Sequence, residues 1–201
     1  GACVYLTIAD GTYVYDGGRL EVIGTSAAPA LISTSVGLSY LNVYAGATIA
    51  AEFGIFELLS SSGVNVHESA NVDPIHSFAN CVFRNGPAGG TLLTLNNSQN
   101  LLIANASFPT TAGGGATNVR KTVNEGIVNL ANATGGFAGE TYDNDDYFRI
   151  FWTTATASPD LRVLKAVWSP ATPDPYLGDS RQVQVTAVNA STGALAQSFY
   201  L

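Results

Sequence analysis

The chain has 201 residues, of which 46% are hydrophobic and only 11% are charged, and its formal net charge at pH 7 is −7. Its eight Lys and Arg residues are scattered, which excludes the concentrated basic surface that nucleic acid binding requires. No segment approaches the roughly 18 to 20 consecutive apolar residues of a membrane-spanning helix. An average soluble domain has about 25% charged residues. A surface solvated by hydroxyls and amides instead of charges is typical of secreted, β-rich surface proteins.

The printed sequence starts with Gly1 instead of Met, and its first residues do not have the pattern of a signal peptide. We expect Gly1 to be either a mature N-terminus left by processing of an exported precursor or the end of a cut fragment. The sequence thus predicts a secreted protein, located outside the cell or at the cell surface.

Short runs of β-branched and aromatic residues, separated by Gly, Asn, Asp or Ser, predict strands along the whole chain. No stretch has the period and the caps of an α-helix. The first fourteen predicted strands are residues 4–8, 12–15, 19–23, 30–34, 40–43, 47–51, 54–58, 63–67, 80–84, 91–95, 100–104, 117–120, 126–130 and 148–153. Residues 138–147 are predicted to be irregular.

A repeat in the middle of the chain identifies the kind of β-structure. Residues 77–83 (SFANCVF) are echoed by residues 102–108 (LIANASF), with Asn80 and Asn105 standing 25 residues apart. A looser copy, residues 128–133 (VNLANA), places Asn132 27 residues further on. Self-similarity at this period is typical of stacked-repeat architectures, in which an Asn at a tight turn bonds to its copies in neighbouring repeats. We therefore predict an all-β fold, a short right-handed parallel β-helix over residues 1–153.

The composition changes near residue 159, because four of the eight prolines fall between positions 159 and 175. Strands are predicted at 161–168, 182–188 and 194–201. Residues 154–201 are therefore either a cap on the open end of the solenoid or the start of a second small β-domain. The apolar end of the chain, Phe199, Tyr200 and Leu201, is predicted either to join a neighbouring subunit as an added strand or to stack end to end with it, which would build a filament or sheath.

Residues 117–122 (TNVRKT), 132–140 (NATGGFAGE) and 142–146 (YDNDD), with Phe151 and Trp152, resemble a known pattern. It is similar to the final coils of secreted bacterial right-handed parallel β-helix repeat proteins. The resemblance covers roughly residues 75–153. It implies a large cell-surface or secreted protein of a family whose members often have no assigned activity.

An acidic segment gives the one candidate metal site. Glu140, Asp143, Asn144, Asp145 and Asp146 place five oxygen-bearing side chains within seven residues. Ca²⁺ takes six to eight oxygen ligands in irregular geometry, so Glu140, Asp143, Asp145 and Asp146 are candidate calcium ligands. The alternative is a solvated loop whose Asp and Asn side chains cap turns. Apart from calcium, no cofactor is expected.

The two cysteines, Cys3 and Cys81, have two interpretations. In an exported protein they are able to form one disulfide that ties the N-terminal segment to the repeats. Alternatively they are separate buried thiols, since Cys81 lies in an alternating strand where Cys packs as a small hydrophobe.

Polysaccharide lyases and hydrolases also use parallel β-helices, and they need acidic residues grouped on one face. In the repeats, Glu52 with Glu57 and Glu68 with Asp73 are close in sequence, and neither pair recurs at the repeat spacing. Segment 67–76, which holds both histidines, has no metal-ligand spacing and predicts a corner loop. No catalytic residue is assigned.

Five tyrosines lie near the N-terminus and form a candidate binding surface: Tyr5, Tyr13, Tyr15, Tyr40 and Tyr44. They are predicted either to form a sugar-binding or self-association face, or to cover the N-terminal end of the solenoid.

Four glycosylation sequons occur. Asn105 and Asn132 coincide with the repeated turn, which favours a structural role for both. Asn96 and Asn189 are the better glycan acceptors.

Together these features predict a non-enzymatic, extracellular structural or adhesive surface protein that self-associates or binds other surface proteins. The alternative is a carbohydrate-binding module or a vestigial polysaccharide-active enzyme.

Overall fold

The computed structural model describes residues 5–8, 10–35, 37–109, 117–153, 161–169, 182–189 and 195–200. The chain divides into two compact units, residues 1–154 and 155–201, where the sequence analysis placed the boundary after residue 153. In the described ranges there is no α-helix, and one 3₁₀ turn occurs at Glu140–Tyr142. No helix in those ranges has the length and apolarity to cross a membrane.

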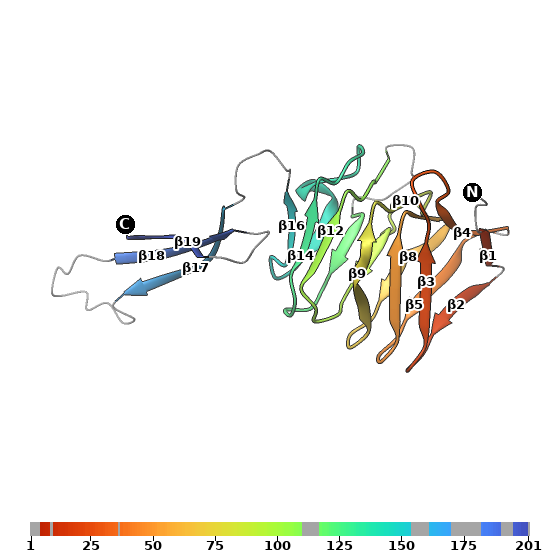
Figure 1. The fold of residues 1–201 in the computed structure, drawn as a ribbon, viewed down its shortest axis with the longest axis horizontal. Coiled ribbons are helices and arrows are strands. Elements are labelled where there is room, and N and C mark those ends of the chain that lie inside the picture. Colours follow the sequence, from red (N-terminus) through yellow and green to blue (C-terminus); the bar gives the residue numbers. More distant parts are fainter. Residues whose placement is uncertain are drawn as a thin grey trace. The chain divides into compact units, whose positions relative to one another are not determined.

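The first unit is a parallel β-solenoid of about five turns, so the predicted fold class is confirmed. Its strands follow one another in chain order along the solenoid (Figure 1). We call each circuit of the chain a coil, and the coils build three faces. Face 1 holds β1 (Tyr5–Ile8), β4 (Ala30–Thr34), β7 (Gly54–Glu57) and β10 (Val82–Arg84). Face 2 holds β2 (Gly11–Val14), β5 (Ser39–Val43), β8 (Leu59–Val66), β11 (Leu93–Leu95), β13 (Val119–Lys121) and β15 (Asp143–Asp145). Face 3 holds β3 (Arg19–Ile23), β6 (Thr48–Glu52) and β9 (Asn71–Ala79), then β12 (Leu101–Ala104), β14 (Val128–Ala131) and β16 (Ile150–Thr153).

The core lies between the three faces and is built from columns of equivalent residues. Strand side chains alternate, so one side of each strand points inward. On face 2, Leu41 pairs with Val64, Val64 with Leu93, and Leu93 with Val119, and all four are at most 1% exposed. Each coil therefore buries its apolar side chains against the coils before and after it.

A stack of aromatic rings runs through the interior beside face 1. The ring centroid of Phe83 lies 5.3 Å from that of Phe56 and 5.4 Å from that of Phe108, with nearly parallel planes. Trp152 meets Phe108 edge to face at 5.7 Å. Phe83 and Phe108 are the two repeated Phe of the sequence analysis, and their stacking explains why that residue recurs at the coil spacing.

The repeated Asn forms a second ladder at the corner between faces 3 and 1. Asn80, Asn105 and Asn132 all have positive φ, between 55° and 57°. Asn105 Nδ2 donates a hydrogen bond to Asn80 Oδ1 at 3.1 Å. Asn tolerates this left-handed conformation better than most residues do. The prediction that the turn Asn bonds to its copy in a neighbouring coil is confirmed for this pair.

The strand prediction was wrong in two places. Strand β9 was missed because Asp73 and Pro74 are strand-breaking residues, and the chain bulges outward at 73–76 between the paired residues Val72 and Ser77. Residues 138–147 were predicted to be irregular, yet they contain the 3₁₀ turn and strand β15. Pairing with β13 imposes strand geometry on this acidic segment against its own propensity.

The second unit holds β17 (Leu161–Ser169), β18 (Gln182–Asn189) and β19 (Leu195–Tyr200). These strands form an antiparallel sheet in the order β17-β18-β19. Phe199 and Tyr200 fall in β19, as the strand prediction expected, and Leu201 lies outside the described residues.

Candidate functional site

The outer side of face 2 on the first three coils carries a group of aromatic and amide side chains. Strand pairing places Tyr13 beside Asn42 and Asn42 beside Asn65. It also pairs Val14 with Val43 and Val43 with Val66, so the residues that follow them form a column. We call the group the face 2 patch; its members are Tyr13, Tyr15, Tyr40, Asn42, Tyr44, Asn65 and His67.

Tyr15, Tyr44 and His67 stack along the solenoid axis. The ring centroids of Tyr15 and Tyr44 are 5.1 Å apart with an interplanar angle of 9°, and those of Tyr44 and His67 are 4.4 Å apart. At these separations neighbouring rings cover one another's faces. The column therefore presents ring edges to solvent along its length, and Tyr15 at its end is 63% exposed.

Tyr13 lies beside this column, with its ring centroid 6.5 Å from that of Tyr15 and 6.4 Å from that of Tyr44 and with nearly parallel planes, and its ring bends back over Gly11. A Cβ at residue 11 would lie 3.0 Å from the Tyr13 hydroxyl oxygen, so the glycine makes room for the phenol. Tyr13 and the neighbouring Tyr40 are 44% and 49% exposed. Desolvation, and secondly the charge of Asp10, raise the pKa of the Tyr13 hydroxyl, which keeps it a neutral donor and acceptor.

Amide groups lie between the aromatic rings. Asn65 Nδ2 donates to Asn42 Oδ1 at 2.7 Å and faces His67 Nε2 at 3.0 Å. Burial lowers the pKa of His67, so the ring is neutral at pH 7, and its Nε2 also lies 3.3 Å from Asn42 Oδ1. This bonding fixes the orientation of the amides beside the tyrosines.

The column continues into a polar hollow of about 280 Å³, which we call the corner pocket. Asn96 N donates to Val66 O, which places Asn96 one coil beyond His67. Asn96 Oδ1 in turn accepts hydrogen bonds from Thr122 N and Oγ1 at 2.9 and 3.2 Å. The pocket lining is Glu68, Ser69, Asn96, Ser98, Thr122, Val123, Asn124, Glu125 and Tyr147.

The four predicted calcium ligands are not brought together. Asp143 Oδ2 accepts from Trp152 Nε1 at 2.6 Å, and Asp145 Oδ2 accepts from Ile150 N at 2.6 Å. Both carboxylates are thus used inside the last coil, while Glu140 belongs to the 3₁₀ turn. In the part of the chain that the structure describes, no three His, Cys, Asp or Glu side chains form a group suited to a metal ion. The alternative role, carboxylates that bond the local backbone, is what the geometry shows for Asp145.

The interior of the last coils holds a residue that the sequence analysis did not single out. Lys121 is fully buried, and its Nζ donates to Asn97 O at 2.7 Å and to Leu95 O at 3.3 Å. Burial lowers the pKa of Lys121 to about 8. Asp145 is its register partner on β15. The inward direction of Lys121 follows from the face 2 register, which sequence alone does not supply.

Cys81 is a free thiol with no exposed surface, and Cys3 lies outside the described residues. Gly54 N donates to Cys81 Sγ at 3.3 Å. Burial raises the pKa of the thiol to about 12. For Cys81 the structure therefore shows the interpretation as a separate buried thiol.

Of the acidic residues considered for polysaccharide chemistry, Glu52, Glu57 and Asp73 each form bonds with different partners. Glu52 on face 3 bonds His76 Nδ1 at 2.8 Å, whereas Glu57 on face 1 bonds Arg84 Nε at 2.8 Å. Asp73 accepts from the backbone N–H groups of the bulge and from Arg19 Nη2 at 2.8 Å. The His76 backbone bond, followed by Arg19, lowers the pKa of Asp73 to about 2.

Of the predicted tyrosines, Tyr13, Tyr15, Tyr40 and Tyr44 meet in the face 2 patch, and nothing is described of the Tyr5 side chain. His67, Asn42 and Asn65 were missed as members of the patch. They join it through strand register, which depends on the loop lengths between coils.

Comparisons with protein-family models, with curated proteins and with solved structures found no match to this chain.

Proposed function

We propose that this chain is a non-enzymatic, extracellular adhesive protein that binds a glycan through the face 2 patch. Its architecture would then be a right-handed helix of the kind found in secreted bacterial parallel β-helix surface proteins. The low charge of the chain and its resemblance to that family support a surface role. The observation that carries the proposal is the exposed set of tyrosines, held beside oriented amides on a sheet.

This arrangement suits a sugar for physical reasons. A pyranose ring has an apolar face of C–H groups and a rim of hydroxyls, so it takes an aromatic surface together with nearby hydrogen-bonding groups. Tyr13 and Tyr40 supply exposed aromatic surface, and so does Tyr15 at the end of the stacked column. Asn65 and the tyrosine hydroxyls supply hydrogen-bonding groups, while Asn42, which is only 8% exposed, holds the Asn65 amide in place.

A glycan array with the intact chain tests the proposal, with Tyr13→Ala and Tyr40→Ala as patch variants. The wild-type chain is expected to retain at least one glycan class, and each variant is expected to lose about tenfold or more in affinity, since a stacked aromatic is worth about 1–3 kcal/mol. Phe148→Ala is the matched control, because Phe148 is an 84% exposed aromatic outside the patch. No binding by the wild type, or equal binding by Tyr13→Ala, overturns the proposal.

Self-assembly is a second candidate function, and the place of β19 favours it. In the described part of the second unit, β19 is an outer strand of its sheet, and an outer strand offers unpaired backbone groups to a further strand. Deleting residues 194–201 is expected to abolish polymers seen by electron microscopy and light scattering while circular dichroism of the solenoid is retained. A full-length chain that stays monomeric, or a polymer that survives the deletion, contradicts this role.

A further inference from the structure

We infer that the corner pocket binds the amine of an amino sugar, so that the glycan held at the face 2 patch is one whose units carry free amines. The inference rests on the proposed glycan binding and adds the substrate class. It follows from the continuity between the patch and the pocket, and from the charges at the pocket.

The patch and the pocket form one continuous strip. Tyr15, Tyr44 and His67 occupy one column, and Asn96 and Thr122 occupy the same column on the next two coils. Glu68 follows His67 in the chain and lines the pocket. Successive coils are about 4.8 Å apart, as paired strands are, so a saccharide chain lying along the column passes from aromatic rings to the pocket within a few coils.

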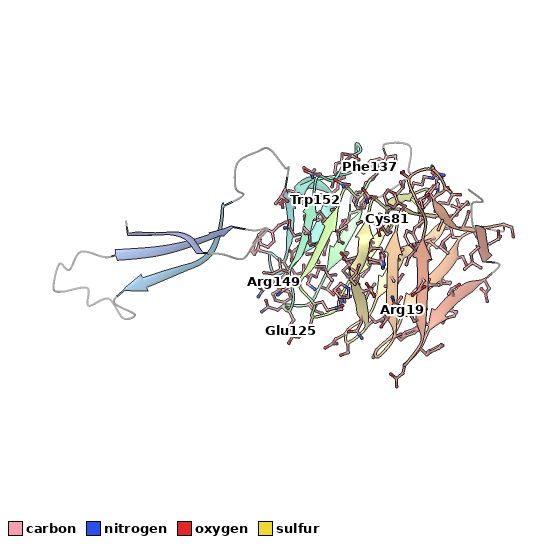
Figure 2. All side chains as sticks on the ribbon, in the orientation of Figure 1. Arg19, Cys81, Glu125, Phe137, Arg149 and Trp152 are labelled. Atoms are coloured by element: carbon pink, nitrogen blue, oxygen red, sulfur yellow. The ribbon has the colours of Figure 1, made fainter. Side chains whose placement is uncertain are left out.

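The charged groups around this strip are mainly acidic. Glu68 and Glu125 line the pocket itself. Arg149 donates to Asn124 Oδ1 from Nε at 3.1 Å and from Nη2 at 2.7 Å, and so brings one positive charge to the pocket wall. Figure 2 shows Glu125 and Arg149 at the same edge of the solenoid.

Of the remaining charges near the strip, Arg120 on β13 is a cation exposed on the outer side of face 2, two residues before Thr122, and three others are carboxylates. Asp146 follows β15 at the same row of corners, and the Asp16 carboxylate lies over Gly46 beside the aromatic column. Asp10 acts on Tyr13 at the start of the patch. Lys121 is buried beneath the corner and donates to backbone carbonyls. The strip therefore repels anionic sugars and attracts a cation.

An ammonium group on a sugar matches what the pocket offers. The ammonium donates three hydrogen bonds, and the residues that line the pocket include two with carboxylates, Glu68 and Glu125, and two with hydroxyls, Ser69 and Ser98. The pocket volume of about 280 Å³ falls just below the range of volumes usual for pockets that bind drug-sized ligands. The pocket is therefore large enough for one sugar unit and too small for a branched group. The neighbouring units then lie over the tyrosines.

The test is calorimetric titration of the full chain with three probes at about pH 6, where a primary amine carries its charge. The probes are a glucosamine oligosaccharide with free amines, its fully N-acetylated counterpart, and a sulfated oligosaccharide of equal length. The wild type is expected to prefer the free-amine probe, with a preference that weakens as salt is added. Glu68→Gln and Glu125→Gln are each expected to reduce that preference by up to about fivefold, the worth of a partly exposed ion pair. Glu140→Gln, which removes a carboxylate outside the pocket, is the control.

The outcomes separate this inference from the proposed function. If no probe binds and the glycan array is also empty, both are overturned. If the N-acetylated probe binds through Tyr13 as tightly as the free-amine probe, and the two glutamine variants are unchanged, glycan binding stands and the amine site is rejected. Preferential binding of the sulfated probe also rejects the amine site.

Discussion

Asn105 shows how the left-handed turn and the side-chain ladder act together at a single residue. Its φ of 57° puts it in the region that a β-carbon disfavours, and its amide bonds the equivalent Asn80 of the preceding coil. We expect Asn105→Ala to lower the free energy of unfolding by about 2 kcal/mol, from backbone strain and the lost hydrogen bond together. Asn105→Gly, which keeps the conformation and loses the bond, is expected to cost about half of that, as measured by urea denaturation. Equal losses in the two variants would show that backbone strain contributes nothing.

Asp143 gives the solenoid a pH dependence whose sign follows from its surroundings. Burial, and then the neighbouring acids Glu140 and Asp145, raise its pKa from 3.8 to about 6, against the opposing bond from Trp152 Nε1. Between these two pKa values the folded chain binds more protons at this site than the unfolded chain does. This contribution therefore stabilises the fold as the pH falls from about 6 toward 4 and is lost as the pH rises through about 6.

Asp143→Asn removes this titration while Asn Oδ1 still accepts from Trp152. The variant is expected to be more stable than the wild type at pH 7, by about 1 kcal/mol after allowance for solvent screening at this partly exposed group. The difference should shrink by pH 4. Thermal unfolding at several pH values measures both effects, and a variant that is less stable at pH 7 contradicts the assignment.

At the scale of elements, the Phe stack makes the strands of face 1 depend on one another. Phe83 is fully buried between Phe56 and Phe108. Phe83→Ala is expected to cost about 3–5 kcal/mol of unfolding free energy, since it leaves a cavity in the middle of the stack. Phe83→Leu fills part of the space and should cost clearly less. Denaturant titration measures both, with exposed Phe148→Ala as a control that changes little; a loss below 1 kcal/mol for Phe83→Ala would refute the role of the stack.

Most strands of the solenoid were predictable because each coil alternates apolar and polar residues between clear turn residues. Strands β3 and β4 match their predicted ranges, and most others differ by one or two residues at an end. Strand β15 was not predictable in this way, since Asp143–Asp145 has no apolar pattern and takes its conformation from pairing with β13. A strand could be predicted from the sequence where the strand propensity of its residues agreed with the pairing found in the structure.

The candidate site was predictable only in part. The cluster of tyrosines is visible in the sequence, because Tyr13 and Tyr15 are two residues apart on one strand face. The addition of His67 and the amides depends on which residues of different coils lie opposite one another. That register is set by loops of unequal length, as the bulge at 73–76 illustrates, and no local pattern specifies it.

At the scale of the whole molecule, the two units have separate strand pairing. Strands β17 to β19 pair only with one another, and the described solenoid strands pair only within the solenoid. A chain that ends at residue 154 is therefore expected to keep its β-sheet circular dichroism and to melt within a few degrees of the full chain. If this shortened chain is unfolded and sensitive to protease, the solenoid requires residues 155–201.

The stacked columns also bear on how such a chain tolerates change over evolutionary time. The effect of a substitution in a ladder depends on the equivalent residues in the neighbouring coils. Asn80 and Asn105 therefore constrain each other, and so do Phe83 and Phe108. Gain or loss of a few residues inside a strand shifts every column, whereas gain or loss of one entire coil leaves all columns matched. The number of whole coils is then the property that varies most freely. The three Ala-Asn pairs of the repeat, at 79–80, 104–105 and 131–132, are what duplication of a coil would leave in the sequence.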